Sequence, residues 1–122
     1  MASSKVKFMV LAFALGVHAN ADETSKEEIV NAKLISSSCI KPFYPKDSLL
    51  NREQGASLIN LHVDLNGDVV EAKVQESSGF VALDEAAIKI FSSCKFSPAT
   101  KNGEPVVSWK ELKYVWKINE KS

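Results

Sequence analysis

Two runs of alternating residues joined by Asn66-Gly67 constrain the fold of this chain more than any other feature. In residues 57–65 and 69–77, apolar side chains recur at every second position, as in strands with one buried face. Asn-Gly is the strongest short signal for a tight hairpin, because both residues accept positive φ. The sequence therefore predicts an antiparallel hairpin whose buried face carries Ile59, Leu61, Val63, Leu65, Val70, Ala72 and Val74.

A helical pattern follows the hairpin. Ser77-Ser78-Gly79 ends the second strand, and apolar residues then recur at helical spacing from Leu83 to Phe91. Asp84 and Glu85 lie in the first turn, where carboxylates interact favourably with the helix macrodipole. Neighbouring helical side chains point about 100° apart, so these two acids are not arranged as a general acid and base. We interpret both as helix-start residues.

The remaining segments complete a small α+β domain with two layers. Residues 46–55 fit a short helix that Gly55 ends. Residues 95–105 are expected to form an irregular connection, because Pro98 and Pro105 disfavour regular structure. Residues 106–118 alternate again and predict a third strand. One face of this strand carries Leu112, Tyr114, Trp116 and Ile118, and the other carries Trp109, Glu111, Lys113, Val115 and Lys117.

The first 21 residues have the pattern of a secretory signal peptide. Lys5 and Lys7 precede the apolar residues 8–17, and Ala19-Asn20-Ala21 fits a cleavage site. This apolar run is about half of the roughly 20 residues that a membrane-spanning helix needs. We therefore predict that the chain is exported from the cytoplasm and that the mature protein begins near Asp22. The expected divisions are a signal peptide over 1–21, a polar leader or linker over 22–38 and a folded domain over 39–119. The leader is expected either to lack a defined order or to form a short helix.

Charge and cysteine content narrow the function classes. Cleavage would leave 13 basic against 15 acidic residues, which argues against binding to nucleic acid or to an anionic membrane. In an oxidising compartment, Cys39 and Cys94 are expected to form one disulfide, worth roughly 4 kcal/mol in the chain-entropy model. A redox pair or a metal pair is the alternative, although neither a CxxC spacing nor a histidine cluster supports it.

No motif of catalysis stands out. Serine, histidine and acidic residues are present, but the chain has no G-x-S-x-G nucleophile elbow and no glycine-rich phosphate loop. His62 projects from the polar face of a strand, where we interpret it as an ordinary exposed residue. The sequence thus predicts no enzyme activity, no catalytic residue, no metal and no cofactor. A small redox protein or hydrolase is the less favoured alternative, which would need reactive Cys39 and Cys94 or an essential His62.

The last strand is long and aromatic, and long edge strands either are protected or receive a partner strand. Small sheets commonly bind peptides by adding such a strand. Tyr114 and Trp116 fit either the core or a binding surface. Trp109 lies on the opposite face and is the better binding candidate.

Several short motifs, in one order and spacing, resemble the C-terminal domain of TonB-family energy transducers. They are Tyr44-Pro45, Gly55, Val63-Asp64 with Gly67 and Val69, Ser77-Ser78-Gly79, Leu83-Asp84 with Ala86-Ala87, Phe96, Pro98-Ala99 and Gly103-Glu104-Pro105-Val106. The resemblance covers residues 39–118. It implies a three-stranded antiparallel sheet with two helices, located in the periplasm of Gram-negative bacteria.

The resemblance also implies a function without chemistry. Such domains bind an N-terminal peptide of an outer-membrane transporter along an edge strand. The partner would be such a peptide or another envelope protein, and a second copy pairing through the same edge is an alternative partner. The residues expected to bind are Tyr44, Pro45, Val107, Trp109, Glu111, Lys113 and Val115.

The chain departs from full-length transducers in two respects. Those proteins have an inner-membrane helix and a proline-rich spacer, whereas residues 22–38 contain no proline. Without cleavage, residues 8–21 would instead act as a short inner-membrane anchor, giving a short energy transducer that faces the periplasm. Cys94 also occupies a position where relatives often carry tryptophan, and a disulfide to Cys39 would replace that packing with a covalent tie.

Overall fold

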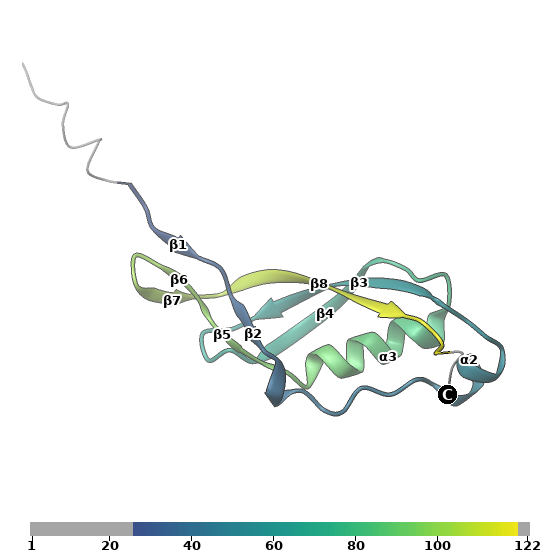
Figure 1. Ribbon diagram of the computed structural model, residues 1–122. Coiled ribbons are helices and arrows are strands. Elements are labelled where there is room, and N and C mark those ends of the chain that lie inside the picture. Colours follow the sequence, from purple (N-terminus) through teal and green to yellow (C-terminus); the bar gives the residue numbers. More distant parts are fainter. Residues whose placement is uncertain (1–25, 120–122) are drawn as a thin grey trace, which may run out of the picture.

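A long hairpin and a third strand form the main sheet of the protein, whose computed structural model describes residues 26–119. Strands β3 (Gly55–Val63), β4 (Val69–Glu76) and β8 (Ser108–Trp116) are antiparallel in the order β4-β3-β8. Helix α3 (Val81–Ser92) lies along one face of this sheet, and the short helix α2 (Lys46–Leu50) precedes β3 (Figure 1). The expected fold class, a small α+β domain with a three-stranded antiparallel sheet and two helices, is confirmed.

The core lies between α3 and the central strand. Ile59, Leu61 and Val63 of β3 are fully buried, and the helix buries Leu83, Ala86, Ala87, Ile90 and Phe91 against them. Each large apolar side chain that is fully buried contributes about 1.5–3 kcal/mol. These buried residues are the ones that the alternation in β3 and the helical spacing in α3 predict for the core.

The hairpin turn differs from the expected two-residue turn. Gly67 has φ of +85°, but Asn66 is not among the described residues with positive φ. The Gly67 amide donates to the Asp64 carbonyl oxygen at 3.0 Å, and the register of β3 with β4 shifts between His62 and Val63. This geometry is a turn followed by a bulge at a left-handed glycine.

The bulge changes which side chains are buried. Leu65 lies in the turn and is 53 % exposed, so its predicted place on the buried face is wrong. Val70 is the extra residue between the partners of His62 and Val63 and is exposed, and Val74 is exposed on the edge strand β4, so their predicted places on the buried face are wrong as well. Ala72 is half-buried against the core, as expected.

Residues 95–106 are not an irregular connection, contrary to the expectation. They form β5 (Lys95–Ser97), β6 (Ala99–Lys101) and β7 (Glu104–Val106). Pro98 falls between two of these strands, and Pro105 lies in β7 at the edge of a small sheet, where a missing amide donor is tolerated.

The residues before Cys39 form strands that pair with β5 and β6. β1 (Ile29–Val30) pairs with β6, β2 (Lys33–Ile35) pairs with β5, and a 3-10 turn η3 (Ser36–Ser38) follows. This part of the expected leader is therefore extended and paired rather than helical. We call residues 29–35 the leader strands.

The two ends of the elongated molecule carry different elements. The leader strands, β6 and β7 lie at one end, whereas α2 and the end of β8 lie at the other (Figure 1). The predicted signal peptide, residues 1–21, lies outside the described residues. The two described α-helices contain 5 and 12 residues, and neither is long and apolar enough to cross a membrane.

Candidate peptide-binding site

Strand β8 forms one edge of the main sheet. It pairs with β3 over nine residue pairs, from Gly55 with Trp116 to Val63 with Ser108. Within residues 26–119, no strand pairs with the other edge of β8. Its outward backbone N–H and C=O groups are therefore available to a further strand.

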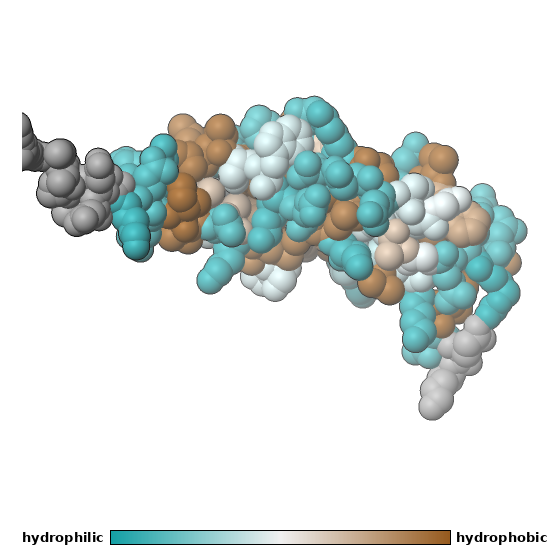
Figure 2. All heavy atoms as spheres, turned by 90° about the horizontal axis from the view of Figure 1, so that it is seen from above, coloured by the Kyte–Doolittle hydropathy of each residue, from teal (hydrophilic) through white to brown (hydrophobic). Residues whose placement is uncertain are grey.

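The outer face of β8 mixes charge with apolar surface. Trp109, Glu111, Lys113 and Val115 are exposed on this face, as their alternation predicts. The Trp109 ring stacks on His62 of β3, with ring centroids 4.6 Å apart, and Lys73 Nζ of β4 lies 5.1 Å from the indole centroid. Figure 2 shows hydrophilic residues over much of the molecule seen from above, with separate apolar residues among them.

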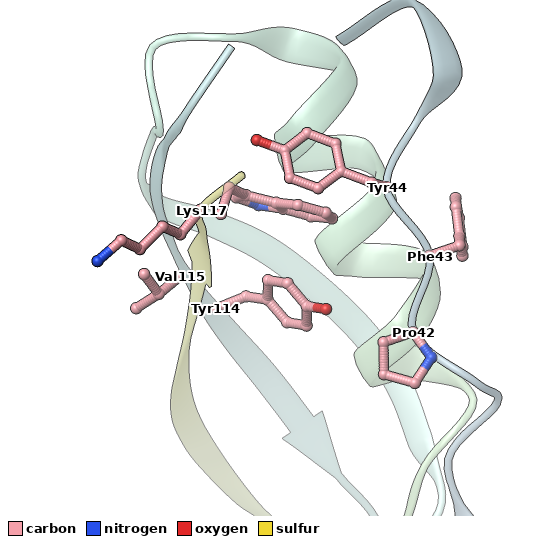
Figure 3. Close-up of a pocket in the computed structure, with 7 residues that line it drawn as sticks. Pro42, Phe43, Tyr44, Tyr114, Val115 and Lys117 are labelled. Atoms are coloured by element: carbon pink, nitrogen blue, oxygen red, sulfur yellow. The ribbon is translucent and has the colours of Figure 1, made fainter. Parts of the chain in front are cut away.

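The inner side of β8 borders a groove near its end. The groove has a volume of about 250 Å³ and lies between β8 and the segment before α2. In Figure 3 the ring of Tyr114 points toward this segment, whereas Val115 and Lys117 point to the other side of the strand. The residues that line it are Pro42, Phe43, Tyr44, Tyr114, Val115, Trp116 and Lys117.

Aromatic rings in contact form the floor of the groove. Tyr44 meets Trp116 edge to face with centroids 5.1 Å apart, and Tyr114 lies 4.4 Å from Trp116. Phe91 of α3 contacts Tyr114 in turn, at 5.9 Å. Aromatic pairs in such geometries contribute about 0.5–1.5 kcal/mol beyond the area they bury. The groove floor is therefore attached to the helix and the core.

A buried polar network fixes Trp116. Its indole N–H donates to Ser57 Oγ at 3.1 Å, and the Ser57 hydroxyl donates to Asp84 Oδ1 at 2.7 Å. The Ser78 amide donates to the same oxygen at 2.8 Å, and the Ser77 hydroxyl donates to Asp84 Oδ2. One carboxylate thus connects β8, β3, α3 and the loop before the helix.

This network corrects the interpretation of Asp84 as only a helix-start residue. Asp84 is 6 % exposed, whereas its neighbour Glu85 is exposed to solvent. Burial opposes ionisation of the Asp84 carboxyl, but the hydrogen bonds from Ser77, Ser78 and Ser57 outweigh it and lower the pKa of the group. The carboxylate is therefore charged at neutral pH and serves as a central acceptor.

Tyr44 is held from both sides of its ring. The phenol hydroxyl donates to the backbone carbonyl oxygen of Glu53, and the ring rests against Trp116. Burial, followed by the nearby Glu53 carboxylate, raises the pKa of Tyr44, and burial raises the pKa of Tyr114. Both phenols are neutral donors at neutral pH.

The predicted site residues do not all meet. Tyr44 and Val115 line the groove together, and Lys113 and Glu111 follow along β8. Trp109 lies towards the other end of the strand, opposite His62, and Val107 lies in the link before β8. Pro45 precedes α2 as its N-cap rather than lining the groove. Their role in binding remains a prediction.

Several groove residues were not among the predicted binding residues. Pro42 and Phe43 form the same wall as Tyr44, and Tyr114, Trp116 and Lys117 come from the strand. The signal in the sequence was the aromatic pair at 43–44 between two prolines. Alternation alone could not show that the inner face of β8 extends to this segment.

The cysteines do not form a free thiol pair. Cys39 and Cys94 are joined in a disulfide, as expected, at the C-terminal end of α3. Among residues 26–119, no three His, Cys, Asp or Glu side chains are grouped so that they could hold a metal ion.

The comparison with known families agrees with this geometry. Residues 40–118 match the family described as the Gram-negative bacterial TonB protein C-terminal. The chain belongs to the TonB C-terminal family. The match includes the groove wall, both described α-helices and the whole main sheet, and it leaves out the leader strands and the turn η3.

Full-length TonB proteins share this segment. The chain is 33 % identical over 78 residues to Protein tonB2 of Pseudomonas aeruginosa, covering 64 % of this chain and 29 % of that protein. It is 29 % identical over 83 residues to Protein TonB of Vibrio cholerae, covering 68 % of this chain and 34 % of that protein. With Protein TonB of Neisseria meningitidis serogroup C the identity is 33 % over 99 residues, covering 80 % of this chain and 31 % of that protein. The matches thus span about a third of each relative's length.

Proposed function

We propose that this chain is a non-enzymatic, periplasmic TonB-type binding module that pairs its β8 edge with a peptide segment of an outer-membrane transporter or another envelope protein. The proposal links the chain to transport across the outer membrane. The observation that carries it is the combination, in a TonB C-terminal domain, of an edge strand and a preformed aromatic groove beside it.

The edge supplies affinity through the backbone. An added strand would pair with β8, and its side chains would alternate between the two faces of the sheet. On one face they would meet Trp109, Glu111, Lys113 and Val115. On the other they would approach the groove at Tyr114 and Trp116, so that the groove selects among apolar side chains.

Rigidity of the site favours binding. The indole of Trp116 is held by Ser57 and indirectly by Asp84, so its ring is ordered before a ligand arrives. A preorganised site avoids part of the entropy cost of ordering side chains on association, which is about 0.5–1.5 kcal/mol for each flexible side chain. The network therefore supports a binding role for this face of β8.

A matched pair of charge substitutions tests the site. Val115→Asp places a carboxylate on β8, and Val70→Asp places one on the opposite edge strand at nearly the same exposure, 61 % against 58 %. We expect Val115→Asp to weaken binding of synthetic N-terminal peptides of outer-membrane transporters by about tenfold or more, whereas Val70→Asp changes it less than twofold. Isothermal titration calorimetry measures both.

Nuclear magnetic resonance locates the bound peptide. Titration should shift the backbone amides of residues 107–117 of the wild-type protein, together with the indole resonance of Trp116. Shifts confined to β4, or equal losses of affinity in the two variants, would contradict binding at β8. The absence of binding by any transporter peptide would contradict the proposed partner class.

The alternative is a short membrane-anchored energy transducer with an uncleaved N-terminus. Residues 8–21 would then serve as the anchor, as part of a chain whose relatives are each about three times as long as the segment matched here. In that case the same β8 edge would bind the same partner, and only the attachment of the domain would differ.

A further inference from the structure

We infer that the Cys39–Cys94 disulfide is a positioning element of the groove, which holds the wall formed by residues 40–45 in place independently of the leader strands. The inference rests on the proposed function for its binding readout, since the wall contributes Pro42, Phe43 and Tyr44 to the proposed site.

The wall has little regular structure of its own. Residues 40–45 belong to no helix or strand, although the wall supplies three of the groove residues. At its far end it is held by Tyr44, which bonds to the Glu53 carbonyl oxygen, and by the start of α2. At its near end the Ile40 amide donates to Ser93 Oγ at 2.9 Å, immediately beside Cys94.

The chain directly before the wall is held by short elements with few buried side chains: Ala32 is buried and Leu34 packs against the core, but residues 35–37 are exposed. β2 pairs with β5 over three residues, and Ile35 is 44 % exposed. The Lys95 amide donates to Ser38 Oγ at 2.7 Å, again at an exposed position. A pair of three residues held by one half-buried side chain opens more readily than the long strands of the main sheet, since local stability follows buried contacts and protected hydrogen bonds.

The disulfide lies between these two segments. Cys94 is 2 % exposed and belongs to the core cluster just after α3, so the bond attaches the start of the wall to the hydrophobic core. Opening of the leader strands must therefore stop at Cys39. Without the bond, the same opening would continue into the wall and release Phe43 and Tyr44 from the groove.

A double-mutant cycle measures this insulation. Ile35→Pro removes a backbone amide and disfavours β2, Ile35→Ala is the matched control that keeps the amide, and Cys39→Ala with Cys94→Ala removes the bond. With the disulfide, we expect Ile35→Pro to change the Kd of a transporter N-terminal peptide less than twofold. In the alanine pair, we expect Ile35→Pro to raise the Kd by a further factor of about ten, because the wall must be ordered on binding.

Backbone dynamics measured by NMR provide a second readout that does not depend on binding. The {¹H}–¹⁵N NOE of Phe43 and Tyr44 should stay high in every protein that keeps the disulfide. It should fall when Ile35→Pro is combined with the alanine pair. This measurement needs no ligand, so it tests the inference even where the peptide does not bind and the proposed function fails.

A core variant separates wall position from overall stability. Val63→Ala destabilises the fold at the end of β3 that pairs with Ser108, at the opposite end of the strand from Gly55 and Trp116. We expect it to leave the Kd and the NOE of Tyr44 unchanged. Equal effects of Ile35→Pro with and without the disulfide, or loss of affinity in Val63→Ala matching that of the combined variant, would overturn the inference.

Discussion

Asp84 couples the groove to pH at the scale of a single residue. Its pKa is lowered from 3.8, so the folded state holds the proton less tightly than the unfolded chain does. The stabilisation is present above the unfolded pKa and is lost as the pH falls through the folded pKa. We therefore predict that the free energy of unfolding decreases as the pH falls below about 4. Urea denaturation at a series of pH values, monitored by Trp fluorescence, measures this decrease.

Two neighbouring acids provide the control. Asp84→Asn should cost about 2–3 kcal/mol at pH 7, because an amide cannot accept all the hydrogen bonds that converge there. It should also flatten the acid limb of the stability profile. The exposed Glu85→Gln should change stability by less than about 0.5 kcal/mol. An acid limb that is the same in Asp84→Asn and wild type would contradict the role of this carboxyl.

Gly67 and Gly103 give a matched test of backbone space. Their φ values, +85° and +86°, are nearly equal, so an added methyl group meets the same local strain at both positions. At Gly67 the Cβ would lie 1.9 Å from the Phe96 carbonyl oxygen, whereas at Gly103 nothing lies within 4 Å. We predict that Gly103→Ala costs about 1–2 kcal/mol and that Gly67→Ala costs clearly more, by chemical denaturation. Equal losses would show that the loop moves away from Phe96 at little cost.

These residues also show where sequence reasoning stops. The helix-start pattern correctly placed Asp84 in the first turn, but its partners Ser57 and Trp116 are far away in sequence. Alternation predicted that Leu65 is buried. It is exposed because it lies in the hairpin turn, where a bulge shifts the register by one residue. Such errors arise from long-range pairing, which a local pattern does not contain.

At the scale of elements, length decided what the sequence could predict. The nine residues of β3 and of β8 and the helical spacing of α3 extend over several periods, so their type and buried faces were predictable. The short strands β1, β2, β5, β6 and β7 have two or three residues each, too few for alternation to be recognised. β1 and β2 form because the chain before the disulfide passes alongside residues 95–101, whereas β7 pairs with β6 in a hairpin of its own.

Hydrogen exchange should rank these elements. β3 pairs on both sides and its inner side chains are fully buried, so its amides should exchange slowest, near the free energy of global unfolding. The outward amides of β8 should exchange faster and become protected when a transporter peptide binds. Protection of those amides without ligand, and dependent on protein concentration, would instead show that a second copy already pairs with the edge.

At the scale of the whole molecule, the leader strands limit how far an anchored domain could reach. Seven residues, 22–28, separate Ala21 from β1, and they span at most about 25 Å when fully extended. If the leader strands opened as far as Cys39, residues 22–38 would span at most about 60 Å. The disulfide would then set the upper limit, because Cys39 is tied to α3.

The N-terminus of the native protein decides between an anchored and a released domain. The cleavage pattern at Ala19-Asn20-Ala21 predicts a chain that begins at Asp22 and is recovered from the periplasm. Intact-mass spectrometry of the protein purified from cells should give the mass of a chain that begins at Asp22, reduced by the mass of the two hydrogens lost when the disulfide forms. Substituting Ala21 with a bulky residue such as Tyr should retain the precursor in the membrane fraction. An intact N-terminus in the wild-type protein, found with the inner membrane, would contradict release and favour the short transducer.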